Sequence, residues 1–451
     1  MTDKQAMTNK TVTNEGKSVW VKVLDDTVNW VDERFPLTSN IKAHLTEYYA
    51  PKNFNFWYFF GSLSLLVLVL QIVTGIFLTM HYKPDAELAF ASVEYIMRDV
   101  PWGWLIRYMH STGASMFFLV IYMHMFRGII YGSYRNPREL IWLFGVGIFL
   151  CLMGEAFFGY LLPWGQMSYW GAQVIVNLFS AIPFIGPDVS EWLRGDYLVS
   201  DATLNRFFAF HVIALPFVLV GLVAAHLIAL HEVGSNNPDG VEIKKLKDKK
   251  TGIPLDGIPF HPYYTVKDIV AVVVFLMVFS AIIFFAPEMG GYFLEANNFV
   301  PANPLVTPVH IAPVWYFTPY YSILRAVPPF PGIGLLGIPP SLFPGVAAMG
   351  LSVMMFALLP WLDKSPVKSI RYRGTLYKKW LAAFVVSFVV LGYLGTEPSN
   401  VWGQFGAWLG NAERATVVAR IFTIIYFAFF ILMPWYTKKD KTSAVPERVT
   451  G

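Results

Sequence analysis

The stretch at residues 104–131, WLIRYMHSTGASMFFLVIYMHMFRGIIY, decides how the chain folds. It is long and apolar enough to cross a bilayer, whose hydrocarbon core of about 30 Å requires roughly 20 mostly apolar residues in a helix. It also carries two histidines, His110 and His124. The 14 residues that separate them rise about 21 Å and turn about 40° short of four full turns. Both imidazoles are therefore expected on nearly the same helix face, one near each side of the membrane.

Seven further segments of the 451-residue chain meet the same length test. The composition agrees, because 55% of the residues are hydrophobic and only 14% are charged, whereas soluble domains average about 25% charged residues. We predict an all-α membrane protein with eight transmembrane helices, the first four forming a four-helix bundle. The predicted spans are 56–80, 104–131, 140–162, 205–230, 268–286, 342–362, 378–396 and 415–436.

The composition also excludes several classes of protein. A soluble enzyme or a disordered chain would need more charged residues. The net charge of +4 gives no support to nucleic-acid binding. The single cysteine, Cys151, lies in an apolar run, so this chain cannot build a disulfide framework, a zinc site or an iron–sulfur cluster from its own cysteines.

Lysines and arginines in the loops orient the predicted spans. They cluster after the second and eighth spans, and in the loops that join spans four to five and six to seven. With eight spans, all of these loops and both termini lie on one side of the membrane, which we expect to be the cytoplasmic side. The predicted units are an N-terminal cytoplasmic segment with an amphipathic surface helix (1–50), the four-helix bundle (51–235), a basic cytoplasmic loop (236–267), a C-terminal four-helix part with an irregular outer-side segment (268–436) and a cytoplasmic tail (437–451).

The fourth span carries a second pair of histidines, His211 and His226. Intramembrane ionisable residues are rare and usually functional, although a single isolated histidine is most simply explained by a hydrogen bond to a neighbouring helix. Spans two and four run in the same direction, so His110 matches His211 in depth and His124 matches His226. Two facing imidazoles can ligate a planar metal macrocycle from both sides, and histidine is a usual haem ligand. The two pairs therefore predict two haems, one above the other across the membrane.

Glycines on the other two spans of the bundle repeat with the same period. Gly61 and Gly75 are 14 residues apart on span one, and Gly145 and Gly159 are 14 apart on span three. A glycine lets a helix backbone approach a large flat ligand closely, although small residues are also common at contacts between transmembrane helices. The shared period favours haem clefts. Three arginines lie near the histidines and are candidates to pair with haem propionates: Arg107, Arg127 and Arg206.

At this point the sequence resembles the cytochrome b family of the quinol–cytochrome c reductases, the cytochrome bc complexes. The resemblance covers roughly residues 20 to 436. It rests on long ordered motifs, namely LQIVTGIFLTMHY (70–82), the stretch 107–134 that begins RYMHSTGASMFF, GYLLPWGQMSYWGA (159–172), RFFAFH with HLIALHEVGSNNP (206–238), PFHPYYTVKD (259–268) and HIAPVWYFTPYYSILR (310–325).

The resemblance implies a reaction. Quinol is oxidised near the outer face. One electron passes to a Rieske iron–sulfur partner and on to a membrane-anchored c-type cytochrome, and the other crosses through two haem b groups to a quinone near the inner face. Proton release and uptake on opposite sides make this a proton-translocating Q cycle, with ubiquinol and ubiquinone as the expected substrate pair. It also implies a homodimeric complex. The extended basic loop and the polar N-terminus favour the inner membrane of a bacterium, with both termini cytoplasmic.

The resemblance also implies roles for individual residues. His110 and His211 should hold the outer, low-potential haem, and His124 and His226 the inner, high-potential haem. The inner quinone site should comprise His231, Ser235, Lys267 and Asp268. The outer quinol site should comprise Tyr160, Gly171, Pro313, Val314, Trp315, Tyr316 and Tyr321.

Two features depart from the family pattern. The family commonly has Pro-Glu-Trp-Tyr at the outer site, and its glutamate is usually thought to accept a quinol proton, whereas this chain has Val314 at that position. We hypothesise that Glu155, inside span three, replaces this glutamate. A lone buried carboxylate costs several kcal/mol unless it is paired or protonated, so this side chain is expected to take up a proton. The second departure is the spacing of 15 residues between His211 and His226. We expect a kink at Pro216 to absorb the extra residue.

Two other functions fit eight spans less well. A secondary transporter could use the histidines and Glu155 as a proton relay, but it predicts inverted repeats and helices broken at mid-membrane. The sequence has no half-to-half similarity, and its proline and glycine breaks fall mostly at the ends of spans. A haem-bearing anchor of a dehydrogenase would leave spans five to eight without a purpose.

Overall fold

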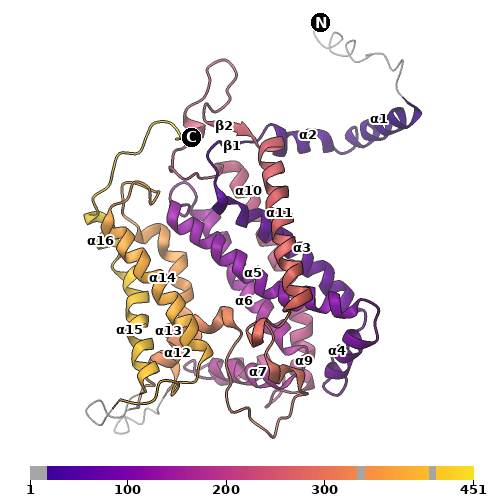
Figure 1. Ribbon diagram of the computed structural model, residues 1–451, viewed down its shortest axis with the longest axis vertical. Helices are drawn as coiled ribbons and strands as arrows, with labels where there is room; N and C mark the ends of the chain where they lie inside the picture. The colour runs from indigo at the N-terminus through magenta and orange to yellow at the C-terminus, as the bar shows by residue number, and fades with distance from the viewer. Residues whose placement is uncertain (1–17, 333–340, 406–412, 451) are drawn as a thin grey trace.

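The computed structural model describes residues 18–332, 341–405 and 413–450. Within these ranges, eight helices are long and apolar enough to cross a membrane, and they run roughly side by side (Figure 1). The prediction of an all-α membrane protein with eight such spans is confirmed. The first 17 residues of the predicted N-terminal segment lie outside the described residues.

The spans are formed by α3 (Phe59–Thr79), α5 (Gly103–Tyr131), α6 (Glu139–Leu161), α9 (Asp201–Ala209) continued by α10 (Leu215–Val233), α11 (Phe260–Phe285), α13 (Phe343–Leu362), α14 (Thr375–Thr396) and α15 (Arg414–Ile431). Shorter helices are α1 (Val19–Asp32), α2 (Leu37–Ile41), α4 (Ala89–Arg98), α7 (Gln166–Phe179), α8 (Gly186–Arg194), α12 (Thr318–Ala326) and α16 (Met433–Lys439). Strands β1 (Tyr49–Pro51) and β2 (Gly257–Pro259) pair antiparallel.

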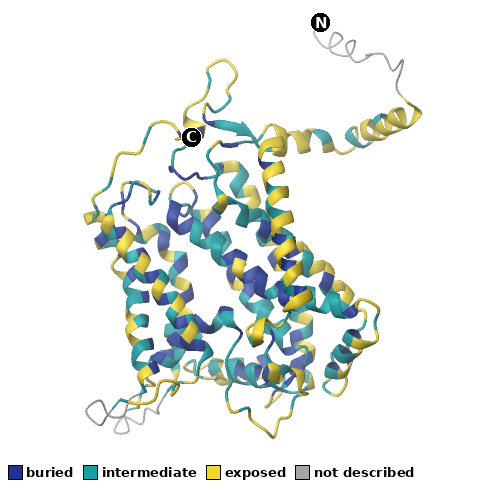
Figure 2. Ribbon diagram, in the orientation of Figure 1, coloured by how far each residue is buried: buried dark blue, intermediate teal, exposed yellow. Residues whose placement is uncertain are grey.

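The spans form two groups that lie side by side (Figure 1). In the first, α3 packs against α5, and α6 packs against α10. In the second, α12, α13, α14 and α15 pack on one another. Many residues on the outward faces of the spans are exposed (Figure 2). They include large apolar side chains such as Phe217 (77% exposed), Ile228 (65%) and Met277 (68%). Such a surface is what the hydrocarbon of a bilayer would cover.

The basic loops predicted to share one side of the membrane do meet at one end of the molecule. Arg448 in the C-terminal tail pairs with Asp256 beside β2, with Nε 2.7 Å from Oδ2. Glu242 lies between Arg138, at 2.6 Å, and Lys368, at 2.5 Å. Burial alone would raise the pKa of Glu242, but these two cations lower it to about 2. The loops after spans two, four and six and the C-terminal tail are therefore joined through ion pairs, as expected when an even number of spans places them on one side.

Span five differs from its predicted start. Helix α11 begins at Phe260 rather than at residue 268, with a non-helical backbone at His261. Hydropathy placed the start too late, because Lys267 and Asp268 interrupt the apolar pattern without interrupting the backbone hydrogen bonds of the helix. The first turns of α11 thus carry these two charged residues into the inner half of the bundle.

The fourth span differs from a simple proline kink. A π-helical turn, Phe210–Ala214, lies between α9 and α10, and the Leu215 N–H bonds the Phe210 carbonyl five residues back. Such a turn accommodates one extra residue in a helix and is frequent at functional sites. The spacing of 15 residues is therefore absorbed just before Pro216, which occupies the first turn of α10, and His211 lies inside the turn itself.

Candidate functional site: two histidine pairs and two cavities

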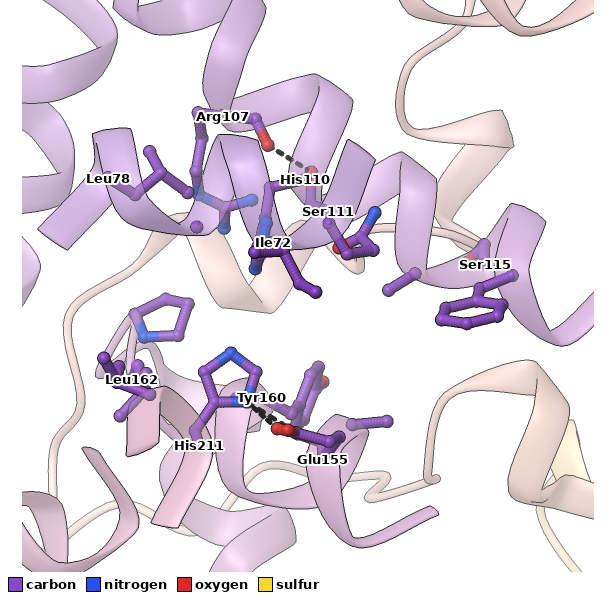
Figure 3. A pocket seen from close by; sticks show the side chains of 18 of the residues that line it. Ile72, Leu78, Arg107, His110, Ser111, Ser115, Glu155, Tyr160, Leu162 and His211 are labelled. Atoms are coloured by element: carbon purple, nitrogen blue, oxygen red, sulfur yellow. Dashed lines mark hydrogen bonds and ion pairs between the residues drawn. The ribbon is translucent and has the colours of Figure 1, made fainter. Parts of the chain in front are cut away.

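The structure brings the four intramembrane histidines together in the two predicted pairs. The ring centroids of His110 and His211 are 6.1 Å apart and the rings are nearly perpendicular, at 89°. Those of His124 and His226 are 6.4 Å apart, at 63°. Figure 3 shows His110 and His211 on opposite walls of one cavity. The members of each pair come from α5 and from the fourth span, which face each other across the bundle.

Hydrogen bonds to a hydroxyl or a backbone carbonyl fix the orientation of three of these rings through Nδ1, and Nδ1 of the fourth, His124, lies 3.4 Å from the Arg127 guanidinium. His211 Nδ1 lies 2.9 Å from the Glu155 carbonyl oxygen, and His226 Nδ1 lies 2.9 Å from the Ile141 carbonyl. His110 Nδ1 lies 3.0 Å from Thr74 Oγ1. Metal-binding histidines commonly use one ring nitrogen for such a contact, which leaves the other free to ligate. The arrangement thus leaves Nε2 available on each of the three rings.

Each predicted glycine lies against one of the histidines. A Cβ at Gly75 would lie 3.2 Å from His110 Cε1, and one at Gly159 only 2.5 Å from His211 Cε1. In the inner half, a Cβ at Gly61 would lie 3.3 Å from His124 Cε1, and one at Gly145 3.5 Å from His226 Cε1. The glycines of α3 and α6 therefore leave space for the imidazoles themselves, which explains the common period of 14 residues.

The residues present fit a haem. Imidazole nitrogens bind metals at about 2 Å, so two rings on opposite sides of one metal ion have centroids about 6 Å apart. The observed separations of 6.1 and 6.4 Å meet this requirement. Within the described ranges, no three His, Cys, Asp or Glu side chains gather around one point. Two imidazoles facing each other suit a metal whose remaining ligands come from a macrocycle.

The outer cavity extends from this pair to the irregular outer segments. Of the residues predicted for the outer quinol site, Glu155, Tyr160, Val314 and Tyr316 line it. The Glu155 carboxylate faces the histidine, with Oε2 2.8 Å from His211 Nδ1 (Figure 3). The other predicted residues support the walls: Gly171 lies against the Tyr160 ring, Trp315 donates a hydrogen bond to Ser115 Oγ, Tyr321 approaches the Ile311 carbonyl, and Pro313 lies within the same outer segment.

Tight packing holds the Val314–Tyr316 segment against the bundle. The Tyr316 ring stacks on Phe118, with centroids 3.9 Å apart and an angle of 4° between the rings. Tyr122 donates a hydrogen bond of 2.5 Å to the Tyr316 carbonyl. The segment thus forms a fixed wall, and its backbone is positioned independently of the side chain at residue 314.

The three candidate arginines differ in position. Arg107 lines the outer cavity and Arg127 lines the inner one. Arg206 is exposed and donates a hydrogen bond to the Trp192 carbonyl instead, so the structure does not bring it to the cavity. The buried guanidinium of Arg138 also lines the inner cavity and bonds the Gly234 carbonyl at 2.9 Å. Its position was missed because it resembles any other arginine in a basic loop.

The inner cavity contains all four residues predicted for the inner quinone site, His231, Ser235, Lys267 and Asp268. Two further residues join them from the N-terminal segment. His44 Nδ1 lies 3.3 Å from His231 Nδ1, and the Tyr48 hydroxyl lies 3.2 Å from Ser235 Oγ. No pattern in the sequence signals His44 and Tyr48, because only the pairing of β1 with β2 brings this segment to the cavity.

Comparison with known proteins gives a consistent match over most of the chain. A family model described as Cytochrome b/b6/petB matches residues 45–234, and one described as Cytochrome b(C-terminal)/b6/petD matches residues 301–427. Cytochrome b of Allochromatium vinosum is 62% identical over 432 residues, which cover 94% of this chain and 99% of that protein. The chain belongs to the cytochrome b family.

Other members of the cytochrome b family agree. Cytochrome b of Rickettsia prowazekii is 46% identical over 96% of this chain and 99% of its own length. A solved chain titled "Hyperthermophilic respiratory Complex III" has a TM-score of 0.79 and 37% identity, covering 91% of this chain and 99% of that chain. The resemblance found in the motifs is confirmed. The chain is thus a haem-binding membrane protein of electron transport and a core subunit of an oxidoreductase of the cytochrome bc type.

Proposed function

We propose that this cytochrome b oxidises quinol at the outer cavity and reduces quinone at the inner cavity of a bacterial inner membrane, with both termini in the cytoplasm. Each ubiquinol loses two electrons and two protons. One electron passes to a Rieske iron–sulfur partner and then to a membrane-anchored c-type cytochrome. The other crosses the membrane to the inner quinone. The single observation that carries the proposal is the presence of two histidine pairs at two depths, each opening onto its own cavity.

The residues of the chain have separate tasks in this proposal. His110 and His211 would hold the outer haem b, and His124 and His226 the inner one. When bound, the two haems supply one-electron carriers at two depths of the membrane. Arg107 and Arg127 line the same cavities, which supports charge pairing with propionates. Glu155, whose Oε2 lies 2.8 Å from His211 Nδ1, would orient that ligand, and we assign it this role rather than that of the proton acceptor expected from the sequence.

The inner cavity has the groups that a quinone acquiring protons requires. His231 and Asp268 can pass protons to a reduced quinone, while Ser235 and Lys267 can donate hydrogen bonds to its carbonyl oxygens. The charges of Arg138 and the other basic residues at this end would favour anionic forms of the quinone. The chain is proposed to act within a homodimer of the complex.

The test uses the purified complex in sealed vesicles with a short-chain ubiquinol and oxidised cytochrome c. We expect cytochrome c reduction accompanied by proton release on the outer side. The variant Asp268→Asn should slow reduction of the inner quinone, while the first electron transfer to the Rieske partner continues. A complex that carries both haems but does not reduce cytochrome c with quinol would overturn the proposal.

A further inference from the structure

We propose that Glu295, in the segment between α11 and α12, accepts a proton from quinol at the outer site. It would replace the glutamate that the family commonly has where this chain has Val314. The inference rests on the proposed quinol oxidation. It concerns the residue that receives the proton, and it is carried by three contacts described below.

The first contact joins Glu295 to the cavity wall. The Tyr160 hydroxyl donates a hydrogen bond to Glu295 Oε2 at 2.9 Å. Tyr160 itself lines the outer cavity, and so do Phe293, Leu294 and Asn298 on either side of Glu295 in the chain. The carboxylate is therefore one hydrogen bond away from a side chain that a bound quinol would touch.

The second contact joins the segment of Glu295 to the segment that carries Val314. The Phe293 ring stacks on Trp315, with centroids 6.4 Å apart and an angle of 24° between the rings. Val314 and Tyr316 flank this tryptophan and line the same cavity. A carboxylate at residue 295 consequently lies beside the wall where the family places its glutamate, although it comes from a different part of the chain.

The third set of contacts holds the segment in place. Asn298 Oδ1 accepts a hydrogen bond from the Ser168 N–H at 2.9 Å, and the Ala302 N–H bonds the Trp164 carbonyl at 3.0 Å. Gly165 and Pro301 form a bridge between the two stretches. A positioned acid or base must remain within hydrogen-bond reach of the group it serves. These bonds fix the backbone after residue 295, and the bond of 3.1 Å from the Phe293 N–H to the Glu288 carbonyl fixes it before that residue.

The environment of Glu295 suits proton exchange near neutral pH. The side chain is half-buried, while the next residues, Ala296 and Asn297, are exposed, so a proton can leave to the outer water. Burial raises the pKa of Glu295 to about 7, and the hydrogen bond from Tyr160 opposes this rise. The titratable groups that face it are the phenols of Tyr160 and Tyr316. Below this pKa the carboxyl is protonated and cannot accept, so acceptance becomes available as the pH rises.

The proton transfer balances as follows. One quinol O–H bond breaks as its proton passes to Glu295, either directly or through the Tyr160 hydroxyl, which gives its own proton to Oε2 and takes that of the quinol. The second proton leaves with the electron that the Rieske partner accepts. The remaining electron goes to the inner acceptor of the proposed function, and quinone is formed. Glu295 then releases its proton to the outer side.

The test measures ubiquinol–cytochrome c reductase activity and its pH profile in the intact complex. Glu295→Gln should lower kcat by about 100-fold, the lower end of the usual contribution of a positioned acid or base, and remove the rise in rate near pH 7. Glu295→Asp keeps a carboxylate and should retain part of the activity. Glu288→Gln changes an exposed carboxylate of the same segment and should leave the rate unchanged. All variants should keep both haem signals.

The double variant Glu295→Gln with Val314→Glu provides the decisive comparison. It restores a carboxylate at the family position, so activity and the pH dependence should return in part if the loss in Glu295→Gln is the loss of a proton acceptor. Wild-type kcat and pH profile in Glu295→Gln would overturn the inference while leaving the proposed function intact. An inactive wild-type complex would overturn the proposed function instead.

Discussion

Replacing Gly159 by alanine should selectively disturb the outer haem. The added Cβ would lie 2.5 Å from His211 Cε1 and 2.9 Å from both ring nitrogens, whereas ordinary contact begins at 3.4 Å. The imidazole must therefore retreat by 3.4 − 2.5 = 0.9 Å, more than the roughly 0.5 Å that a ligand site tolerates. Disturbing the orientation of a metal ligand typically costs 10- to 100-fold in affinity, or about 1.4 to 2.8 kcal/mol.

Two matched substitutions isolate this effect. A Cβ at Gly145 would lie 3.5 Å from His226 Cε1, in ordinary contact, and one at Gly221 would meet nothing within 4 Å. The assay is a redox-titrated difference spectrum with haem quantified per complex. Gly159→Ala should lose or shift the low-potential component alone, while Gly145→Ala and Gly221→Ala keep both components. An unchanged low-potential component at full occupancy in Gly159→Ala would refute the steric reasoning.

Three further predictions concern the inner end of the molecule. Asp363→Ala should lower stability by about 3 to 5 kcal/mol, measured by thermal unfolding, because it leaves the fully buried Arg373 guanidinium without its partner; the same change at the exposed Glu33 should have no measurable effect. Arg448→Ala should speed proteolysis of the C-terminal tail, because it removes the bonds from Arg448 to Asp256, and equal cleavage rates of variant and wild type at neutral pH would contradict this. Those bonds help to lower the pKa of Asp256 to about 2. The stability that they provide is therefore complete above the pKa of an unfolded aspartate, about 4, and is lost as the pH falls towards 2. Glu242→Gln should weaken quinone binding at the inner cavity by releasing the Arg138 guanidinium, without changing initial quinol oxidation at the outer cavity; a parallel loss at both sites would contradict this assignment.

The sequence was sufficient to predict the spans and the histidine pairs because both depend on regular helical geometry. A run of about 20 apolar residues has few alternatives to a membrane helix. Spacings of 14 and 15 residues place His110 with His211, and His124 with His226, once the direction of each span is known. The same regular spacing predicted the four glycines as part of the site. The structure shows in addition that each of them lies against an imidazole ring.

The features that the sequence did not reveal depend on tertiary packing or on local backbone irregularity. The extra residue before His226 indicates that the helix must adjust, but nothing in its side chains distinguishes a π-helical turn at Phe210–Ala214 from a kink at Pro216. Glu295 lies in an irregular segment with no periodicity, and its position depends on its hydrogen bond with Tyr160 and on the bond between Asn298 and Ser168 in α7. His44 reaches the inner cavity through tertiary contacts, because its segment packs against α11 and its ring meets His231.

The most direct test of the two histidine pairs is a redox-titrated difference spectrum of the purified complex, compared with that of the His211→Asn variant. The structure predicts two b-type components with separate midpoint potentials in the wild type, and loss of only the lower-potential component in the variant. A single component in the wild type, or the loss of both components in a variant that remains folded, would contradict two independent haem sites.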